Sequence, residues 1–175
     1  ETLLTMIEKD EIELAFFGHN PLLSPSSTLT MQSLGRSSFA LIAPPDHPWA
    51  QWKIISPAQL LEENFISYSK DTAHYCFVND FFLNNKLKTP RLTQVDNEEL
   101  LLQLVTQGFG IGIAMEIAVR KEVKQKEVII LSLQNLAGIS REIFLAHSTI
   151  KGLTYAGWEM GKVAEQITFD FLNQG

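Results

Sequence analysis

The sequence is poor in cysteine and in long apolar runs, and both shortages restrict what the protein can be. Cys76 is the single cysteine among 175 residues, so an internal disulfide is excluded, which suits a reducing cytosol. We interpret Cys76 as a small buried hydrophobic side chain and not as a nucleophile. The longest apolar runs, such as 111–115 and 128–131, are far too short to cross a bilayer. No charged segment followed by an apolar one opens the chain, so no signal peptide is expected.

The sequence also has no excess of basic residues. The formal net charge is −6, whereas a nucleic-acid-binding domain usually carries a basic face. The densest basic stretch, residues 120–127, is diluted by acidic residues and is typical of a solvated helix surface. We therefore expect no direct DNA binding by this chain.

Patterns that would indicate catalysis or a metal site are missing. The histidines are scattered without metal-ligand spacing, and neither a G-x-S-x-G elbow nor a P-loop is present. The adjacent carboxylates Asp96, Glu98 and Glu99 could act as acid and base, but helix capping explains them better because an apolar helical stripe follows. We expect no enzyme, no catalytic residue, no metal and no cofactor.

Residues 95–114 form the most informative stretch that is present. Asp96 is the expected N-cap of a helix, with Glu99 at the capping-box position, and Gly108 is expected to close that helix in a left-handed conformation. Gly110 and Gly112 allow close backbone approach in the strand that follows. The spacing G-x-G-x-G after a helix differs from the dinucleotide fingerprint, so we favour packing over phosphate binding.

Predicted strands alternate with predicted helices, which favours an α/β fold. The expected strands cover residues 12–17, 38–44, 65–68, 92–95, 111–114, 128–133 and 141–147. The expected helices cover residues 1–9, a short turn from Ser56 and Pro57, and 75–84, 96–107, 115–126 and 153–171. The last helix has an amphipathic stripe formed by Leu153, Ala156, Met160, Val163, Ile167 and Phe171.

Several segments in order resemble the effector-binding domain of LysR-type transcriptional regulators. Residues 104–112 read LVTQGFGIG, similar to the family's LVxxGxGIG segment, and residues 46–50 read DHPWA, similar to its HPlA motif. Residues 3–17 resemble the family's helix that feeds a strand, and residues 141–147 resemble its return strand. We interpret His47, which precedes a proline, as a structural turn residue.

The resemblance implies a two-lobed periplasmic-binding-protein type II fold. Residues 1–65 would form the first part of lobe I, residues 66–140 lobe II, and residues 141–175 the return strand and C-terminal helix of lobe I. Relative to the family pattern, lobe I would lack its first strand-helix-strand, which normally supplies one wall of the effector site. The DNA-binding helix-turn-helix of the family would be absent as well.

The resemblance further implies a cytoplasmic ligand-sensing domain. A small metabolite would bind in the cleft between the lobes and change the geometry of a homodimer or tetramer, while DNA would be contacted only through the absent helix-turn-helix and no membrane would be involved. The alternative is a solute-binding protein of a transporter, which shares the architecture. A helix-turn-helix in the upstream reading frame would favour the regulator, and a signal peptide the transporter protein.

Strand ends and helix starts suggest where the effector would bind. Backbone donors, hydroxyl groups and partial positive charge gather at such places, which suits a small polar or carboxylated metabolite. His19 could instead be an ordinary surface histidine, and Ser69, Thr72 and Asp96 could simply cap their own helices. The predicted effector-binding residues are Phe17, Gly18 and His19 from lobe I and Ser69, Thr72, Asp96 and Asn97 from lobe II.

Overall fold

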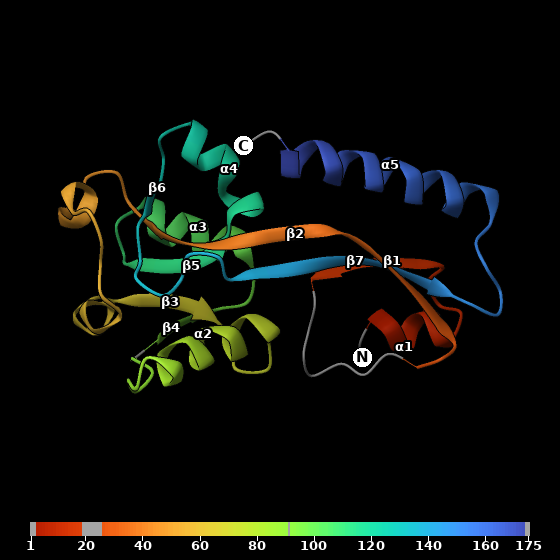
Figure 1. Cartoon of the computed structure of the whole chain (residues 1–175), viewed down its shortest axis with the longest axis horizontal. Helices are drawn as coiled ribbons and strands as arrows, with labels where there is room; N and C mark the ends of the chain where they lie inside the picture. Colours follow the sequence, from red (N-terminus) through yellow and green to blue (C-terminus); the bar gives the residue numbers. More distant parts are fainter. Residues whose placement is uncertain (1–2, 19–25, 91, 174–175) are drawn as a thin grey trace. The chain divides into compact units, whose positions relative to one another are not determined.

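The computed structural model describes residues 3–18, 26–90 and 92–173, and it divides into two compact units (Figure 1). Unit 1 comprises Glu1–Ser37 and Ser140–Gly175, and unit 2 comprises Ser38–Ile139. The long strand β2, Leu29–Ala43, begins in unit 1 and ends in unit 2. Residues 38–65 group with unit 2 because the end of β2 pairs with strands of that unit. The lobe boundaries proposed from the sequence stay a prediction.

Unit 1 is built on a small sheet with one short helix packed against it. Strand β1, Leu14–Gly18, pairs antiparallel with β7, Ser140–Ser148, and β7 lies between β1 and β2 in the hydrogen-bonded order. Helix α1, Leu3–Glu8, buries Leu4 and Ile7 against Ala15 and Ala146. This core is small, and among the described residues Ile12, Phe17, Leu29 and Met31 pack against it while only partly buried.

Unit 2 contains a mixed sheet in the order β2-β5-β3-β4, with β6 also pairing with β2. Strand β3 is parallel to both β4 and β5, whereas β2 is antiparallel to β5 and β6. The strands are β3, Phe65–Tyr68; β4, Leu92–Val95; β5, Ile111–Met115; and β6, Ile129–Leu131. The helices are α2, Ala73–Asn84; α3, Glu98–Thr106; and α4, Glu116–Lys124, with 3₁₀ turns η1, Pro48–Gln51, and η2, Pro57–Glu62.

Both faces of the unit 2 sheet are covered, because neighbouring residues of each strand point to opposite faces. Phe65 belongs to the cluster that contains Phe82 of α2, whereas the next residue, Ile66, belongs to the cluster that contains Leu101 of α3. Val119 of α4 joins the second cluster. A sheet covered on both faces explains why its central strands β3 and β5 are rich in apolar residues, whereas the edge strand β4 keeps the polar residues Thr93 and Gln94.

The start of α3 differs from the prediction by one residue. Asn97, not Asp96, is the N-cap: its side-chain oxygen accepts a hydrogen bond of 2.8 Å from the backbone N–H of Leu100. Leu100 therefore occupies the third helical position, and Glu99 cannot complete the predicted capping box. Aspartate and asparagine cap equally well, so the residue types alone do not decide between neighbours.

The end of α3 confirms the predicted role of the glycines. Gly108 has φ +77°, and its N–H donates to Val105 while the N–H of Phe109 donates to Leu104, a Schellman motif. At Gly110 a side chain would collide with the backbone carbonyl of Asn64. At Gly112 an added Cβ would lie 3.1 Å from the carbonyl oxygen of Ile66. Close backbone approach therefore accounts for both later glycines.

Several other elements differ in length or kind from the expectation. Strand β2 begins at Leu29, well before the predicted residue 38, whereas β6 covers only part of the predicted 128–133. The turn opened by Ser56 is 3₁₀, with Gln59 accepting from the Ser56 backbone N–H at 2.8 Å. Cys76 is only half-buried, because it lies on the side of α2 away from the buried residues Val78 and Phe82.

Helix α5, Tyr155–Asn173, forms where the sequence predicts a helix, but its apolar stripe is exposed. The exposed fractions of Met160, Val163 and Ile167 are 56%, 51% and 51%. Lys162 lies 3.7 Å from the ring centroid of Trp158, and its hydrogen bond to Glu159 lowers the pKa of that carboxyl group. Within the described part of the chain, no element covers this stripe.

Candidate functional site

The carboxyl ends of the parallel strands in unit 2 bring the predicted lobe II residues to one edge. Tyr68 of β3 is in register with Val95 of β4, and the Ser69 N–H donates to the Val95 carbonyl at 3.2 Å. The chain then enters α2 after one strand and α3 after the other. Ser69 and Thr72 therefore turn at the same edge of the sheet as Asp96 and Asn97. Ligands of open α/β sheets bind outside such strand ends.

The start of α2 is held by Thr72. Its hydroxyl oxygen accepts from the Tyr75 N–H at 3.1 Å, and the same hydroxyl donates to the Ser69 carbonyl at 2.8 Å. Thr72 is therefore a helix cap, which is the alternative interpretation of this residue. The hydroxyl oxygen keeps one further lone pair, since a hydroxyl group offers one donor and two acceptor sites. Capping and ligand contact thus remain compatible at this residue.

The three helices that follow the parallel strands differ in charge at their starts. Helix α3 carries Glu98 and Glu99 in its first turn, and α4 carries Glu116. Helix α2 has no acidic residue in its first turn, although Asp71 precedes its cap. Because backbone N–H groups give a helix start partial positive charge, α2 offers the most favourable of these places for an anion. Asp96 is exposed and would oppose an anion placed beside it.

The predicted residues of unit 1 are only partly described. Phe17 is half-buried, and its ring centroid lies 6.2 Å from that of Phe144 on the paired strand β7. Gly18 ends β1 close to Arg141, whose Cδ would lie 2.6 Å from a Cβ added at the glycine. A larger residue at position 18 would therefore displace the Arg141 side chain. His19 lies outside the described residues.

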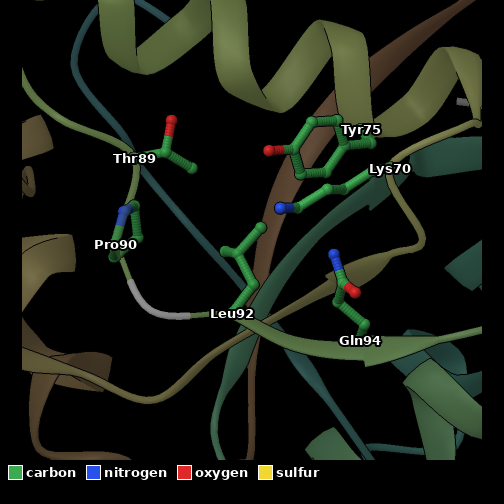
Figure 2. A pocket seen from close by; sticks show the side chains of 6 residues that line it. All are labelled: Lys70, Tyr75, Thr89, Pro90, Leu92 and Gln94. Atoms are coloured by element: carbon green, nitrogen blue, oxygen red, sulfur yellow. The ribbon is translucent and has the colours of Figure 1, made fainter.

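A cavity that the sequence did not indicate lies beside α2 and β4 (Figure 2). Its volume is about 400 Å³, within the usual range for small-molecule pockets. Lys70 is the one charged residue among its described lining residues, which also include Tyr75 and Gln94. Lys70 lies between the predicted residues Ser69 and Thr72. The sequence feature that could have indicated this cavity is a basic residue at the end of a predicted strand in an acidic chain.

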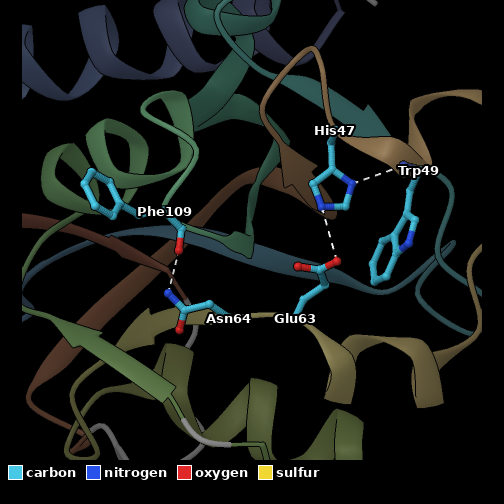
Figure 3. Close-up of polar contacts among 5 residues, drawn as sticks. All are labelled: His47, Trp49, Glu63, Asn64 and Phe109. Atoms are coloured by element: carbon cyan, nitrogen blue, oxygen red, sulfur yellow. Dashed lines mark hydrogen bonds and ion pairs between the residues drawn. The ribbon is translucent and has the colours of Figure 1, made fainter.

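His47 is a structural residue, as predicted (Figure 3). Its Nδ1 accepts from the Trp49 N–H at 3.2 Å, and its Nε2 lies 3.6 Å from a carboxylate oxygen of Glu63. The neighbouring Asn64 amide donates to the Phe109 carbonyl at 2.5 Å, joining the start of β3 to the loop before β5. These contacts fix the turn after β2 and account for His47 as a structural residue.

The described residues offer neither a metal-binding cluster nor a membrane-spanning helix. No group of three or more His, Cys, Asp or Glu residues is placed there so that it could hold a metal ion. None of the described helices combines the length and apolar character needed to cross a membrane.

Comparison with protein families gives one match that covers most of the chain. Residues 1–155 match the family model of the LysR substrate binding domain. The probable RuBisCO transcriptional regulator of Phaeodactylum tricornutum (strain CCAP 1055/1) is 29% identical over 129 residues, covering 72% of this chain and 42% of that protein. The RuBisCO operon transcriptional regulator of Allochromatium vinosum is 23% identical over 156 residues, covering 89% of this chain and 50% of that protein. The chain thus spans half or less of these relatives.

Two solved structures similar to this chain are a regulatory domain and an effector-binding domain. The regulatory domain of CcmR from Synechocystis PCC6803, in complex with 2-PG, matches with a TM-score of 0.77 at 21% identity, covering 94% of this chain and 77% of that one. The effector-binding domain of QuiR in complex with shikimate matches with a TM-score of 0.71 at 16% identity, covering 97% of this chain and 74% of that one. At these identities the likeness concerns the fold.

Proposed function

Because the chain belongs to the LysR substrate binding domain family, we propose that it binds a small metabolite and transmits this binding to the geometry of an oligomeric regulator. The chain is a ligand-sensing regulatory domain, and its fold is the periplasmic-binding-protein type II fold, as predicted. The family match is the observation that carries the proposal. The transporter alternative is not retained, since the matching curated proteins are transcriptional regulators.

We propose that the effector contacts the residues predicted from the sequence. Support from unit 2 is the common edge at which β3 and β4 end, together with the start of α2 that lacks acidic residues. Thr72 has one hydroxyl lone pair to spare, and Asn97 keeps an amide group that can donate after its oxygen has capped α3. The proposed residues are Phe17, Gly18, His19, Ser69, Thr72, Asp96 and Asn97.

The expected ligand is a small polar or carboxylated metabolite. Helix starts favour negative charge through their unpaired N–H groups, and the start of α2 is the least opposed by acidic side chains. Two structures of similar fold are complexes, CcmR with 2-PG and QuiR with shikimate, which makes both compounds the first probes.

A thermal-shift screen of the chain against small carboxylated and phosphorylated metabolites, beginning with 2-PG and shikimate, tests the proposal. A ligand at about a hundredfold its dissociation constant should raise Tm by about 5–10 °C, because it binds only the folded state. The shift should saturate with concentration. If no member of a broad metabolite panel stabilises the chain, the proposed function is wrong.

The remaining proposals concern the whole regulator. We propose a homodimer or tetramer in which DNA is contacted only through a helix-turn-helix outside this chain, acting in the cytoplasm and without enzymatic activity. The family is one of regulators, and the net charge of −6 disfavours direct DNA contact by the sensing domain. Steady turnover of a bound metabolite, abolished by a substitution at Thr72, would contradict the absence of catalysis.

A further inference from the structure

We propose a second ligand site within unit 2, a pocket for the oxyanion group of a small molecule lined by Lys70, Tyr75 and Gln94 (Figure 2). The cavity of about 400 Å³ is bordered by the start of α2, the turn after β3, Thr89 and Pro90, and the edge strand β4. It would recognise a phosphate or carboxylate group. The proposal does not depend on the effector site proposed above.

The pocket extends along strand β4, from the turn after β3 towards the amino end of β4. Leu92 and Gln94 are two residues apart on β4 and so face the same side of the sheet. Leu92 packs against the cluster that contains the buried residues of α2, so this side is the one that α2 covers. Leu92 is in register with Phe65, the first residue of β3, whereas Asp96 follows the opposite end of β4. The cavity therefore occupies the space between α2 and the sheet edge.

Its polar groups are unpaired. Within the described part of the chain, the Lys70 ammonium has no carboxylate within ion-pair distance, and the Tyr75 hydroxyl and Gln94 side-chain amide have no hydrogen-bond partner. Figure 2 shows the Lys70 ammonium between the Tyr75 ring and the Gln94 amide nitrogen. The Thr89 hydroxyl is already engaged, since it donates to the Asn79 side-chain oxygen at 2.7 Å.

These groups match an oxyanion in sign and in hydrogen-bonding type. Lysine is always a donor, the tyrosine hydroxyl can donate, and the primary amide contributes N–H groups. No acidic residue lines the described part of the cavity, although the whole chain carries a net charge of −6. Leu92 and Pro90 add an apolar wall for a short carbon skeleton. An oxyanion would form a charge-assisted hydrogen bond with Lys70, which a neutral or cationic ligand would not.

The site is tested by titrating the intact chain with inorganic phosphate and, in a separate experiment, with acetate. Two-dimensional NMR spectra of the backbone amides monitor binding at each step. We expect saturable shifts centred on Lys70, Tyr75 and Gln94 with at least one anion. The anion that binds more tightly identifies the phosphate or the carboxylate as the preferred group. An absence of saturable shifts at these residues with both anions would overturn the proposal.

Variants distinguish specific binding in this pocket from non-specific electrostatic attraction of anions to the protein surface. Lys70→Ala should weaken binding about tenfold, because it removes a charged hydrogen bond, and Tyr75→Phe about threefold. Lys124→Ala removes the same charge from an exposed position in the last turn of α4 and should leave the affinity unchanged. Equal losses in Lys70→Ala and Lys124→Ala, or no loss in either Lys70→Ala or Tyr75→Phe, would contradict a specific pocket.

Discussion

At the scale of single residues, the start of α3 separates two neighbouring polar side chains with different roles. Asn97 caps the helix through its side-chain oxygen, whereas Asp96 is exposed and makes no cap. Asn97→Ala should therefore lower the free energy of unfolding by about 1 kcal/mol, and Asp96→Ala should change it by less than about 0.5 kcal/mol. Urea denaturation of both variants measures the difference. A larger loss in Asp96→Ala than in Asn97→Ala would show that the cap is misassigned.

Two glycines after α3 lead to a second prediction at the residue scale. Gly108→Ala meets no neighbouring atom but forces a side chain into a left-handed conformation, at a cost of about 1–2 kcal/mol. Gly110→Ala should cost more than Gly108→Ala, because its Cβ would collide with the rigid Asn64 backbone carbonyl. Urea denaturation gives both values. A Gly110→Ala variant as stable as the original chain would contradict the close packing of this loop.

The sequence predicted the glycine positions correctly, the cap of α3 one residue early, and the cavity beside Lys70 not at all. The glycine spacing indicated a helix stop and close backbone approach, because no other residue type tolerates both conditions. The cap was predicted one residue early, since only the backbone angles distinguish Asp96 from Asn97. The cavity beside Lys70 was not predicted, because it is formed by β4 and α2, which become neighbours only on folding.

At the scale of elements, α5 shows what the periodicity of apolar residues can and cannot predict. The spacing of Val163, Ile167 and Phe171 predicted a helix correctly, and the helix forms. Periodicity identifies which side chains share a face but not what covers that face. Strands β3 and β5 were easier to predict, because a sheet covered on both faces favours apolar residues at successive positions of its central strands.

The exposure of α5 makes a quantitative prediction. Ile167→Lys should change the free energy of unfolding of the monomer by less than about 0.5 kcal/mol, because the side chain is 51% exposed. Phe82→Ala is the contrasting control and should cost about 3–5 kcal/mol, since Phe82 is fully buried. Urea denaturation at low protein concentration compares them. A loss above about 2 kcal/mol in Ile167→Lys would mean that the stripe is covered in solution.

At the scale of the whole molecule, the net charge leads to a prediction about DNA binding. With a net charge of −6, we predict no sequence-selective DNA binding by the 175-residue chain in a gel-shift assay at physiological salt. Non-specific contacts weaken steeply as salt rises, so any residual binding should disappear. Saturable binding to one sequence over a scrambled control would contradict this prediction.

The most direct test of the ligand-sensing account measures affinity and stability together at Thr72. For the metabolite that stabilises the chain most, calorimetric titration should give an affinity about 5- to 150-fold weaker in Thr72→Ala, because a polar group of the ligand loses its partner. Thr72→Ser keeps the hydroxyl group that caps α2 and should bind nearly as well as the original chain. If Thr72→Ala loses stability but binds the metabolite with unchanged affinity, Thr72 is a helix cap alone and the proposed effector site is wrong.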